Sequence, residues 1–131
     1  MKNISFEEAE KIKIEYGLQK NLENKEIFPI LLNGASILRD EILKHFIYWH
    51  THEDEDGVKN PVIQKILLCG GNSNLVGLSD YFRASMKTEV EIANVWTNIY
   101  DLNKDTPMIN SKEALSLATV IGLALNDFYN D

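Results

Sequence analysis

The chain has 131 residues, 44% hydrophobic and 25% charged, which is the balance of a globular domain able to bury a core. Thirteen basic residues against twenty acidic ones give a net charge of -7, which argues against nucleic acid or an anionic membrane surface as a partner. The single cysteine, Cys69, excludes an intrachain disulfide framework and a multi-cysteine zinc site. No apolar stretch approaches the roughly 18 residues that cross a membrane, and the N-terminus has no apolar signal core, so we expect a cytoplasmic protein without membrane insertion.

Two helices are predicted in the first half of the chain. Ser5 and Glu8 form a capping box, and apolar residues at helical spacing then predict a helix over residues 5–16. Gly17 suits the left-handed position that ends such a helix. Apolar residues return at helical spacing over residues 29–50, which predicts a second helix with its proline in the first turn. The polar segment between the two is predicted as an irregular loop.

A strand, a turn and a helix are predicted in the middle of the chain. The apolar run over residues 63–69 predicts a strand buried on both faces, with the Cys69 thiol in the core. Two glycines at 70–71 break this strand. The polar residues 72–74 offer caps for a helix over residues 75–86.

The last part of the chain is predicted to add one or two strands and a helix. Residues 89–92 alternate as a short strand does, residues 95–100 are predicted to be extended, and a loop runs on to Met108. Asn110 begins another capping box, which predicts a helix over residues 111–127 that is apolar almost all round and therefore covered on most sides. The order of elements predicts an α/β fold.

The double-glycine turn is the first candidate binding site. Open α/β sheets bind ligands at the carboxyl ends of their strands, and Gly70 and Gly71 allow the backbone to approach a ligand closely. The helix beyond the turn would offer unpaired N–H groups. The turn matches neither a dinucleotide-binding nor a P-loop motif. From the residues alone, a tight turn capped by Asn72, Ser73 and Asn74 remains the slightly favoured alternative.

Two groups of charged residues are further candidate sites. Glu10 and Lys13 lie on one face of the first helix, where a solvated ion pair is the favoured interpretation from the residues alone. His50, His52 and the acidic residues 53–56 have the chemistry of a metal site. Their spacing is not that of an EF-hand, so a charged surface loop is predicted and no metal site. No catalytic triad and no catalytic pair of carboxylates is recognised.

Three stretches carry family-like motifs. Residues 5–17 resemble an AExxKxxYG helix, and residues 66–78 resemble a strand and "adenosine" loop of the pattern hhhxGGxSxhxGh. Residues 91–96 and 118–125 resemble a VExxNPW segment and a closing ATxIGLAL helix, with Val95 in place of the usual proline. In this order the stretches resemble the actin-like ATPase superfamily, within it the PilM family of type IV pilus assembly proteins and its relative, the FtsA family of cell division.

The resemblance implies a partial actin-like, ribonuclease H-like ATPase lobe. Two or three strands would form a small sheet covered by the helices at residues 5–16, 75–86 and 111–127, and the long helix of residues 29–50 would belong to the smaller subdomain. In the superfamily, the Glu and Lys of the first helix contact the ribose and base, and the double-glycine loop packs against the adenosine side of the nucleotide. The residues that take these roles here are Glu10, Lys13, Gly70, Gly71, Asn72, Ser73 and Asn74.

The resemblance also implies what this chain lacks. Family members carry two phosphate-binding hairpins and a catalytic carboxylate before the AExxK helix, and only four residues precede Ser5 here. We therefore expect residues 1–131 to be a single partial domain, the C-terminal part of the second lobe, with no catalytic residue and no enzyme activity. ATP or ADP would bind weakly, and Mg²⁺ only together with the missing lobe.

The expected function is that of a PilM-like component of the inner-membrane platform of type IV pilus assembly, in the cytoplasm or at the periphery of that membrane. It would supply the adenosine-side half of an ATP site and protein–protein contacts, with PilN-like inner-membrane proteins as family partners. The alternative is an FtsA-like fragment that acts in cell division or forms filaments. The unprotected edge of the strand at residues 63–69 further predicts self-association, or pairing with a fragment that supplies upstream strands.

Overall fold

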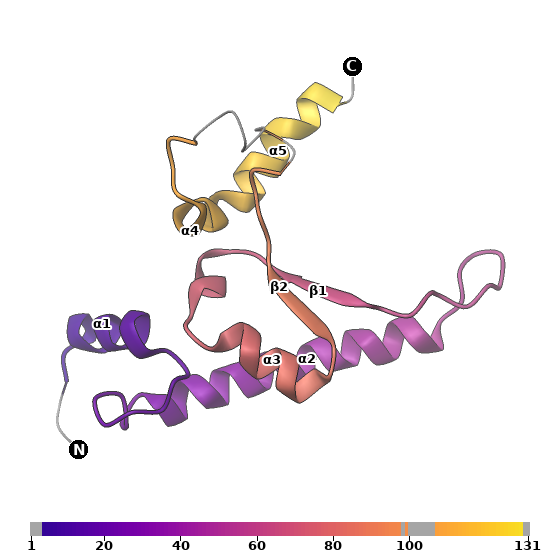
Figure 1. Cartoon of the computed structure of the whole chain (residues 1–131). Helices are drawn as coiled ribbons and strands as arrows, with labels where there is room; N and C mark the ends of the chain where they lie inside the picture. Colours follow the sequence, from indigo (N-terminus) through magenta and orange to yellow (C-terminus); the bar gives the residue numbers. More distant parts are fainter. Residues whose placement is uncertain (1–3, 98, 100–106, 130–131) are drawn as a thin grey trace. The chain divides into compact units, whose positions relative to one another are not determined.

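The computed structural model describes residues 4–97, 99 and 107–129, which divide into two compact units (Figure 1). The first unit comprises Met1–Ile66 and Leu75–Val90, and the second comprises Leu67–Asn74 and Glu91–Asp131. The described elements, in chain order, are α1 (Phe6–Tyr16), α2 (Phe28–Thr51), β1 (Lys65–Leu68), the 3-10 turn η1 (Gly71–Asn74), α3 (Leu78–Met86), β2 (Glu89–Ile92), α4 (Ser111–Ala114), the 3-10 turn η2 (Leu115–Leu117) and α5 (Ala118–Tyr129).

The first helix has its predicted cap and ends at the predicted residue, but Gly17, with a ψ of -124°, does not adopt the predicted left-handed conformation. The Ser5 Oγ accepts a hydrogen bond from the Glu8 N–H at 3.2 Å, and Gly17 ends α1 with a positive φ of 49°. The N–H of Gly17 donates to the Lys13 carbonyl at 2.9 Å. None of the residues of α1 is buried, and Phe6 is 83% exposed, so the apolar face that was predicted to cover a sheet is open at its start.

The loop between α1 and α2 is built around a buried asparagine. Asn24 is fully buried, and its Nδ2 donates to the carbonyls of Gly17 at 3.2 Å and Gln19 at 2.8 Å. Its Oδ1 accepts the N–H of Asn21 at 2.9 Å. Because these bonds satisfy both ends of the amide, Asn24 fixes a loop that otherwise consists of turns. The irregular loop was predicted, but the sequence analysis did not single out Asn24.

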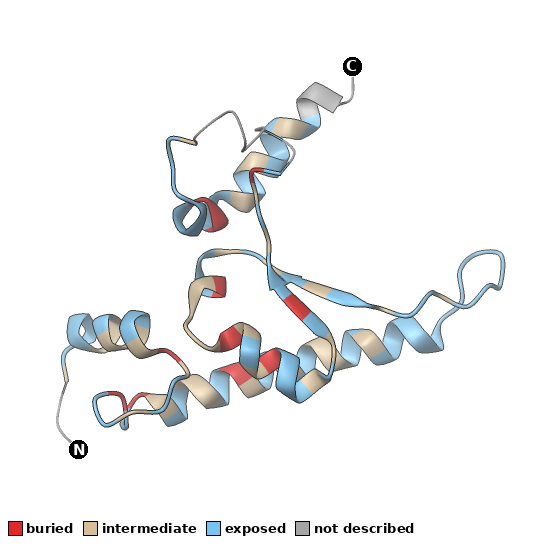
Figure 2. Ribbon diagram, viewed as in Figure 1, coloured by how far each residue is buried: buried red, intermediate tan, exposed pale blue. Residues whose placement is uncertain are grey.

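The second helix has nearly its predicted bounds and packs against α3. It contains 24 residues, with Pro29 in the first turn. Ala35 is its buried residue, and the guanidinium of Arg39 donates to the hydroxyl of Tyr81 on α3 at 3.3 Å. Figure 2 shows the buried positions where α2 and α3 face each other and exposed positions along much of α2.

The sheet has two parallel strands, β1 and β2, joined through α3. Lys65 and Glu89 form an ion pair at 3.7 Å where the two strands begin. The predicted burial of β1 on both faces is wrong: its residues alternate between exposed and half-buried, Leu67 is 60% exposed, and Cys69 is exposed rather than in the core. Successive side chains of a strand point to opposite faces, so a strand covered on one face shows this alternation.

The third helix begins three residues later than predicted. Gly77, with a φ of 79°, forms the residue before α3, and residues 71–74 form a 3-10 turn instead of its caps. The core beside this helix consists of Leu78, Phe82 and Val90, which are 6%, 0% and 0% exposed. The amphipathic pattern of α3 was therefore predicted correctly, although its start was not.

The second unit departs from prediction in two places. Residues 95–97 form a turn and are not extended, because Asn94 accepts the N–H of Trp96 on its Oδ1 and the N–H of Thr97 on its carbonyl. The rest of that prediction, at 98 and 100, and most of the following loop, 101–106, lie outside the described residues.

The predicted last helix is present but divided. The Asn110 Oδ1 accepts the N–H of Glu113 at 3.0 Å, which confirms Asn110 as the N-cap. The helical segment then passes from α4 through η2 into α5. Leu115 is 2% exposed, whereas Val120 and Leu123 are 64% and 67% exposed, so the predicted cover on most sides is wrong for α5.

Candidate functional site

The double-glycine turn follows β1 after Cys69 and forms a tight backbone turn. Gly70 has a φ of 91°, which an L side chain adopts only under strain, and Gly71 to Asn74 form one 3-10 turn. The Ser73 N–H donates to the Gly70 carbonyl at 3.1 Å, and Ser73 is 6% exposed. The sequence predicts a turn at this position. Its internal hydrogen bonding agrees with the alternative interpretation, in which these residues form a tight turn.

This turn is fixed by hydrogen bonds to the segment that leads into the last helix. The Gly70 N–H donates to the Leu115 carbonyl at 3.0 Å, and the Asn74 Nδ2 donates to the Lys112 carbonyl at 2.8 Å. A Cβ built on Gly71 would lie 3.5 Å from the Cβ of Ser116, an ordinary contact distance. The loop is therefore held rigidly from one side, by residues that lie far away in the sequence.

The role predicted for residues 72–74 as helix caps is wrong. The Asn74 side chain bonds carbonyls, those of Lys112 and of Gly71, whereas a cap of α3 would accept from its first N–H groups. The residue before α3 is Gly77, which has no side chain to cap the helix. The Asn74 side chain thus stabilises the turn itself.

Glu10 and Lys13 form an ion pair on α1 within the first unit. The Lys13 Nζ lies 2.6 Å from the Glu10 Oε1, and the side chains are 29% and 42% exposed, respectively. This is the i,i+3 pairing that the sequence predicts, and it leaves both groups accessible to water and to a ligand. The residues of the double-glycine turn belong to the second unit, whereas Glu10 and Lys13 belong to the first.

A second close approach of backbone, which the sequence analysis missed, fixes the end of α1. A Cβ on Gly17 would lie 2.4 Å from the carbonyl oxygen of Val76, and the Leu18 N–H donates to that same oxygen at 2.8 Å. Gly77 also lies close to this segment, since its Cβ would lie 3.3 Å from the Cβ of Leu18. The end of α1 is thereby joined to the turn that precedes α3.

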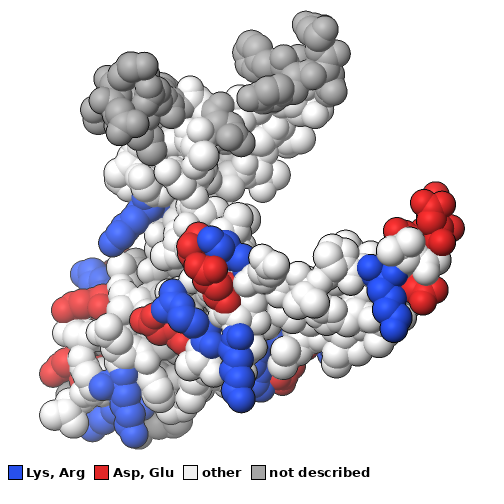
Figure 3. Space-filling model, turned by 45° about the vertical axis from the view of Figure 1, so that its right-hand side comes forward, with Lys and Arg blue, Asp and Glu red and all other residues white. Residues whose placement is uncertain are grey.

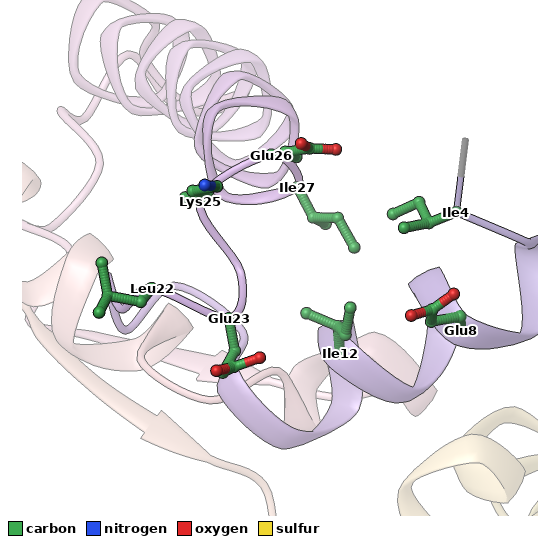
Figure 4. Close-up of a pocket in the computed structure, with 8 residues that line it drawn as sticks. All are labelled: Ile4, Glu8, Ile12, Leu22, Glu23, Lys25, Glu26 and Ile27. Atoms are coloured by element: carbon green, nitrogen blue, oxygen red, sulfur yellow. The ribbon is translucent and has the colours of Figure 1, made fainter. Parts of the chain in front are cut away.

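A pocket of about 340 Å³ lies on another side of α1, between its start and the loop that enters α2 (Figure 4). Its walls combine aliphatic side chains with charged ones, of which three are carboxylates and one is an ammonium group. An excess of carboxylates repels phosphate, so this pocket is not a nucleotide phosphate site. The residues that line it are Ile4, Glu8, Ile12, Leu22, Glu23, Lys25, Glu26 and Ile27.

The acidic loop after α2 forms an ordered turn. The Asp54 Oδ1 accepts the N–H groups of Asp56 and Val58 at 3.1 and 2.7 Å, and Glu53 and Lys59 form an antiparallel bridge. Figure 3 shows acidic side chains gathered over this end of the first unit. Across the residues that the structure describes, no group of three or more His, Cys, Asp or Glu side chains is placed to hold a metal ion.

The described helices contain none long and apolar enough to cross a membrane. In comparisons with known proteins, no curated protein and no solved structure matches the chain. A family model does match: the model described as "Type IV pilus assembly protein PilM" matches residues 1–128, nearly the whole chain. The sequence motifs of the first helix, the double-glycine turn and the closing helix lie within this match. The chain therefore belongs to the PilM family of type IV pilus assembly proteins.

Proposed function

We propose that this chain contributes the adenosine side of an ATP-binding site to the PilM component of the pilus assembly platform, on the cytoplasmic side of the inner membrane. The proposal depends on the observation that a glycine occupies position 71, although the chain's own packing does not require one. Its φ is not left-handed, and a Cβ there would make an ordinary contact with Ser116, so the packing of the chain does not itself demand a glycine. A ligand that lies against the backbone does demand one.

The rigidity of the turn supports the same proposal. Hydrogen bonds to the carbonyls of Leu115 and Lys112 hold Gly70 and Asn74 in place before any ligand arrives. A preorganised loop binds a flat base and sugar without losing further conformational entropy. The accessible ammonium of Lys13 and carboxylate of Glu10 would hydrogen-bond the ribose and base.

The proposed site binds nucleotide weakly and performs no hydrolysis in this chain by itself. In phosphoryl-transfer enzymes, the phosphate-binding loops and Mg²⁺ position the reacting groups and neutralise their charge. The half-site proposed here offers contacts to the adenosine part only. We expect a dissociation constant of about 1 mM or weaker for ADP, and Mg²⁺ binding only when the other lobe supplies phosphate contacts.

Partner binding is the second part of the proposed function. PilN-like inner-membrane proteins remain the partners we propose from family membership. The two-stranded sheet of the described residues, in which β1 pairs with β2, also supports the addition of a further strand, from a second copy or from a complementing fragment. The matching family model is that of PilM, so the FtsA-like alternative is not favoured.

The test is an NMR titration of the whole chain with ADP, in the wild type and in two glycine variants. We expect amide shifts at Gly70 to Asn74 and on α1 around Glu10 and Lys13. Gly71→Val should remove these shifts, because a branched side chain beside Ser116 blocks the close approach of a ligand to the backbone. The matched control is Gly122→Val in α5, where an added Cβ meets no described atom within 4 Å.

Three outcomes would contradict the proposal. They are shifts that cluster around the acidic loop at residues 53–56, equal binding by the Gly71→Val variant, and phosphate release from ATP above background. Glu10→Gln adds a further check, with Asp80→Asn as its control, because Asp80 and Arg83 form a comparable i,i+3 pair at 2.7 Å on α3. Only the Glu10 variant should weaken ADP binding.

A further inference from the structure

The outward side of α2 carries a row of exposed residues at alternating spacings of three and four. This spacing keeps the residues on one side of the helix, away from the buried Ala35 on the side that packs against α3. Ile37 and Tyr48 in this row are 62% and 60% exposed. The row, hereafter the α2 stripe, consists of Gly34, Ile37, Glu41, Lys44, Tyr48 and Thr51.

Gly34 is the member of the α2 stripe that the packing of this chain explains least. Within the described part of the chain, a Cβ on Gly34 would meet no atom within 4 Å. Glycine in a helix interior costs about 1 kcal/mol relative to alanine. Gly34 therefore weakens α2 without allowing a close contact inside the described chain. The absence of a side chain there leaves space for the backbone of another molecule.

We propose that α2 binds the α2 helix of a second copy of this chain as an antiparallel pair, about a twofold axis at the midpoint between Ile42 and Leu43. Ile37 and Tyr48 lie equally far on either side of this midpoint, so each Ile37 faces the Tyr48 of the other copy. Twofold interfaces require such self-complementarity. Antiparallel helices with this spacing pack ridges into grooves at a shallow crossing angle.

The charges of the α2 stripe are complementary about the same midpoint. Glu41 and Lys44 lie equally far from it, so each carboxylate faces the ammonium group of the other copy. Within one chain these groups form an ion pair at 2.7 Å, with side chains 54% and 70% exposed, and His45 lies 4.0 Å from the carboxylate. In the pair, each carboxylate would accept from both lysines. A parallel pair in register would instead set Glu41 against Glu41, which disfavours that orientation.

The outer positions fit as well. Gly34 and Thr51 lie equally far from the midpoint, so the smallest residue of the stripe faces the hydroxyl side chain at the end of α2.

One helix packed against one helix forms a small interface, below the size of stable protein complexes. We therefore expect a weak dimer, with a dissociation constant between about 1 μM and 1 mM. This proposal does not rest on the nucleotide site.

The test is a charge exchange followed by sedimentation equilibrium of the whole chain up to about 1 mM, the weak end of the expected range. Glu41→Lys and Lys44→Glu should each lower the association constant at least about tenfold, because like charges then face each other. The two substitutions together should restore it to within about threefold. Asp80→Lys on α3 is the control, since it changes net charge as much as Glu41→Lys without touching the stripe. Circular dichroism verifies that helix content is unchanged.

Orientation is tested by cross-linking in a Cys69→Ser background. A mixture of chains carrying Ile37→Cys with chains carrying Tyr48→Cys should form a disulfide between copies. Chains carrying Ile37→Cys by themselves should not, because the two positions would lie about 16 Å apart along an antiparallel pair. The proposal is overturned by a monomer throughout the concentration range, by single charge reversals that leave association unchanged, or by preferred cross-linking of Ile37→Cys to itself.

Discussion

At the end of α1, Gly17 sits where a side chain has no room, whereas on the outward face of α2 Gly34 sits in open space. A Cβ on Gly17 would collide with the carbonyl oxygen of Val76 at 2.4 Å, but a Cβ on Gly34 meets no described atom within 4 Å. The first glycine is required by the fold of the first unit. The second is not, so its presence points to something outside the chain. The packing of the chain does not require a glycine at Gly71 either. The proposed nucleotide site depends on Gly71, and the proposed helix pair depends on Gly34.

The largest effect is expected for Gly17→Ala. The substitution adds a Cβ at a φ of 49° and against backbone, so we expect a loss of at least about 3 kcal/mol in the free energy of unfolding, measured in urea. Gly57→Ala separates strain from collision. Gly57 also has a positive φ, 74°, but its Cβ would lie 3.9 Å from the nearest atom, a Glu53 oxygen, so a loss of only about 1 kcal/mol is expected. Equal losses would show that backbone conformation, not the contact with Val76, makes Gly17 necessary.

A smaller loss is expected for Asn24→Ala. Removing the amide leaves the carbonyls of Gly17 and Gln19 without its two hydrogen bonds at a buried position, so unfolding should become easier by about 1–3 kcal/mol. Asn60→Ala is the matched control. Asn60 also donates to two carbonyls, those of Trp49 and His52, but these hydrogen bonds are exposed to solvent. Asn60→Ala should therefore lower the free energy of unfolding by less than about 1 kcal/mol. If the two variants unfold alike, burial of Asn24 does not organise the loop.

Gly34→Ala is expected to have opposite effects on two measurements. In dilute solution the variant should be more stable by about 0.5–1 kcal/mol, because alanine is the better helix former and its methyl group has open space. At high concentration the same methyl group should weaken self-association. A variant that gains stability and associates as the wild type does would mean that Gly34 serves no partner helix.

The smallest effect concerns Glu41 and pH. The hydrogen bond from Lys44 lowers the pKa of Glu41 and raises the pKa of Lys44. A lowered carboxyl pKa gives a stabilising contribution that is complete above the unfolded value, about 4.3, and disappears as the pH falls through the lower folded value. NMR titration of the Glu41 carboxyl should therefore show a midpoint that rises in the Lys44→Met variant. An unchanged midpoint would mean that the ion pair is not formed in solution.

Local signals predicted much of the fold. The caps at Ser5 and Asn110 were predicted because a cap depends on residues only three positions apart. The exposure of Leu67 and the late start of α3 were not, because they depend on which segments come to lie beside them in space. The turn at residues 95–97 was a missed local signal, since Asn94 accepts the N–H groups of Trp96 and Thr97. Periodicity can identify an apolar face, but it cannot tell whether another segment covers that face.

The candidate site shows the same limit. The residues of the double-glycine turn and the Glu10–Lys13 pair were predicted from spacing and from resemblance to a family. The bonds that hold Gly70 and Asn74 to the segment of residues 112–115 connect positions about forty apart, and no local pattern indicates them. Asn24 was missed for a related reason, since a buried asparagine in a polar loop looks like its exposed neighbours in the sequence.

Adenosine-side binding is tested most directly by comparing adenosine, ADP and inorganic phosphate in NMR titrations of the same chain. Adenosine and ADP should shift the same amides, those of Gly70 to Asn74 and of α1 near Lys13, with dissociation constants within about threefold of each other, because the half-site contacts the nucleoside. Phosphate should leave these amides unchanged. The contrary result, in which phosphate reproduces the ADP shifts and adenosine produces none, would show that the double-glycine turn binds anions and not the adenosine side of a nucleotide.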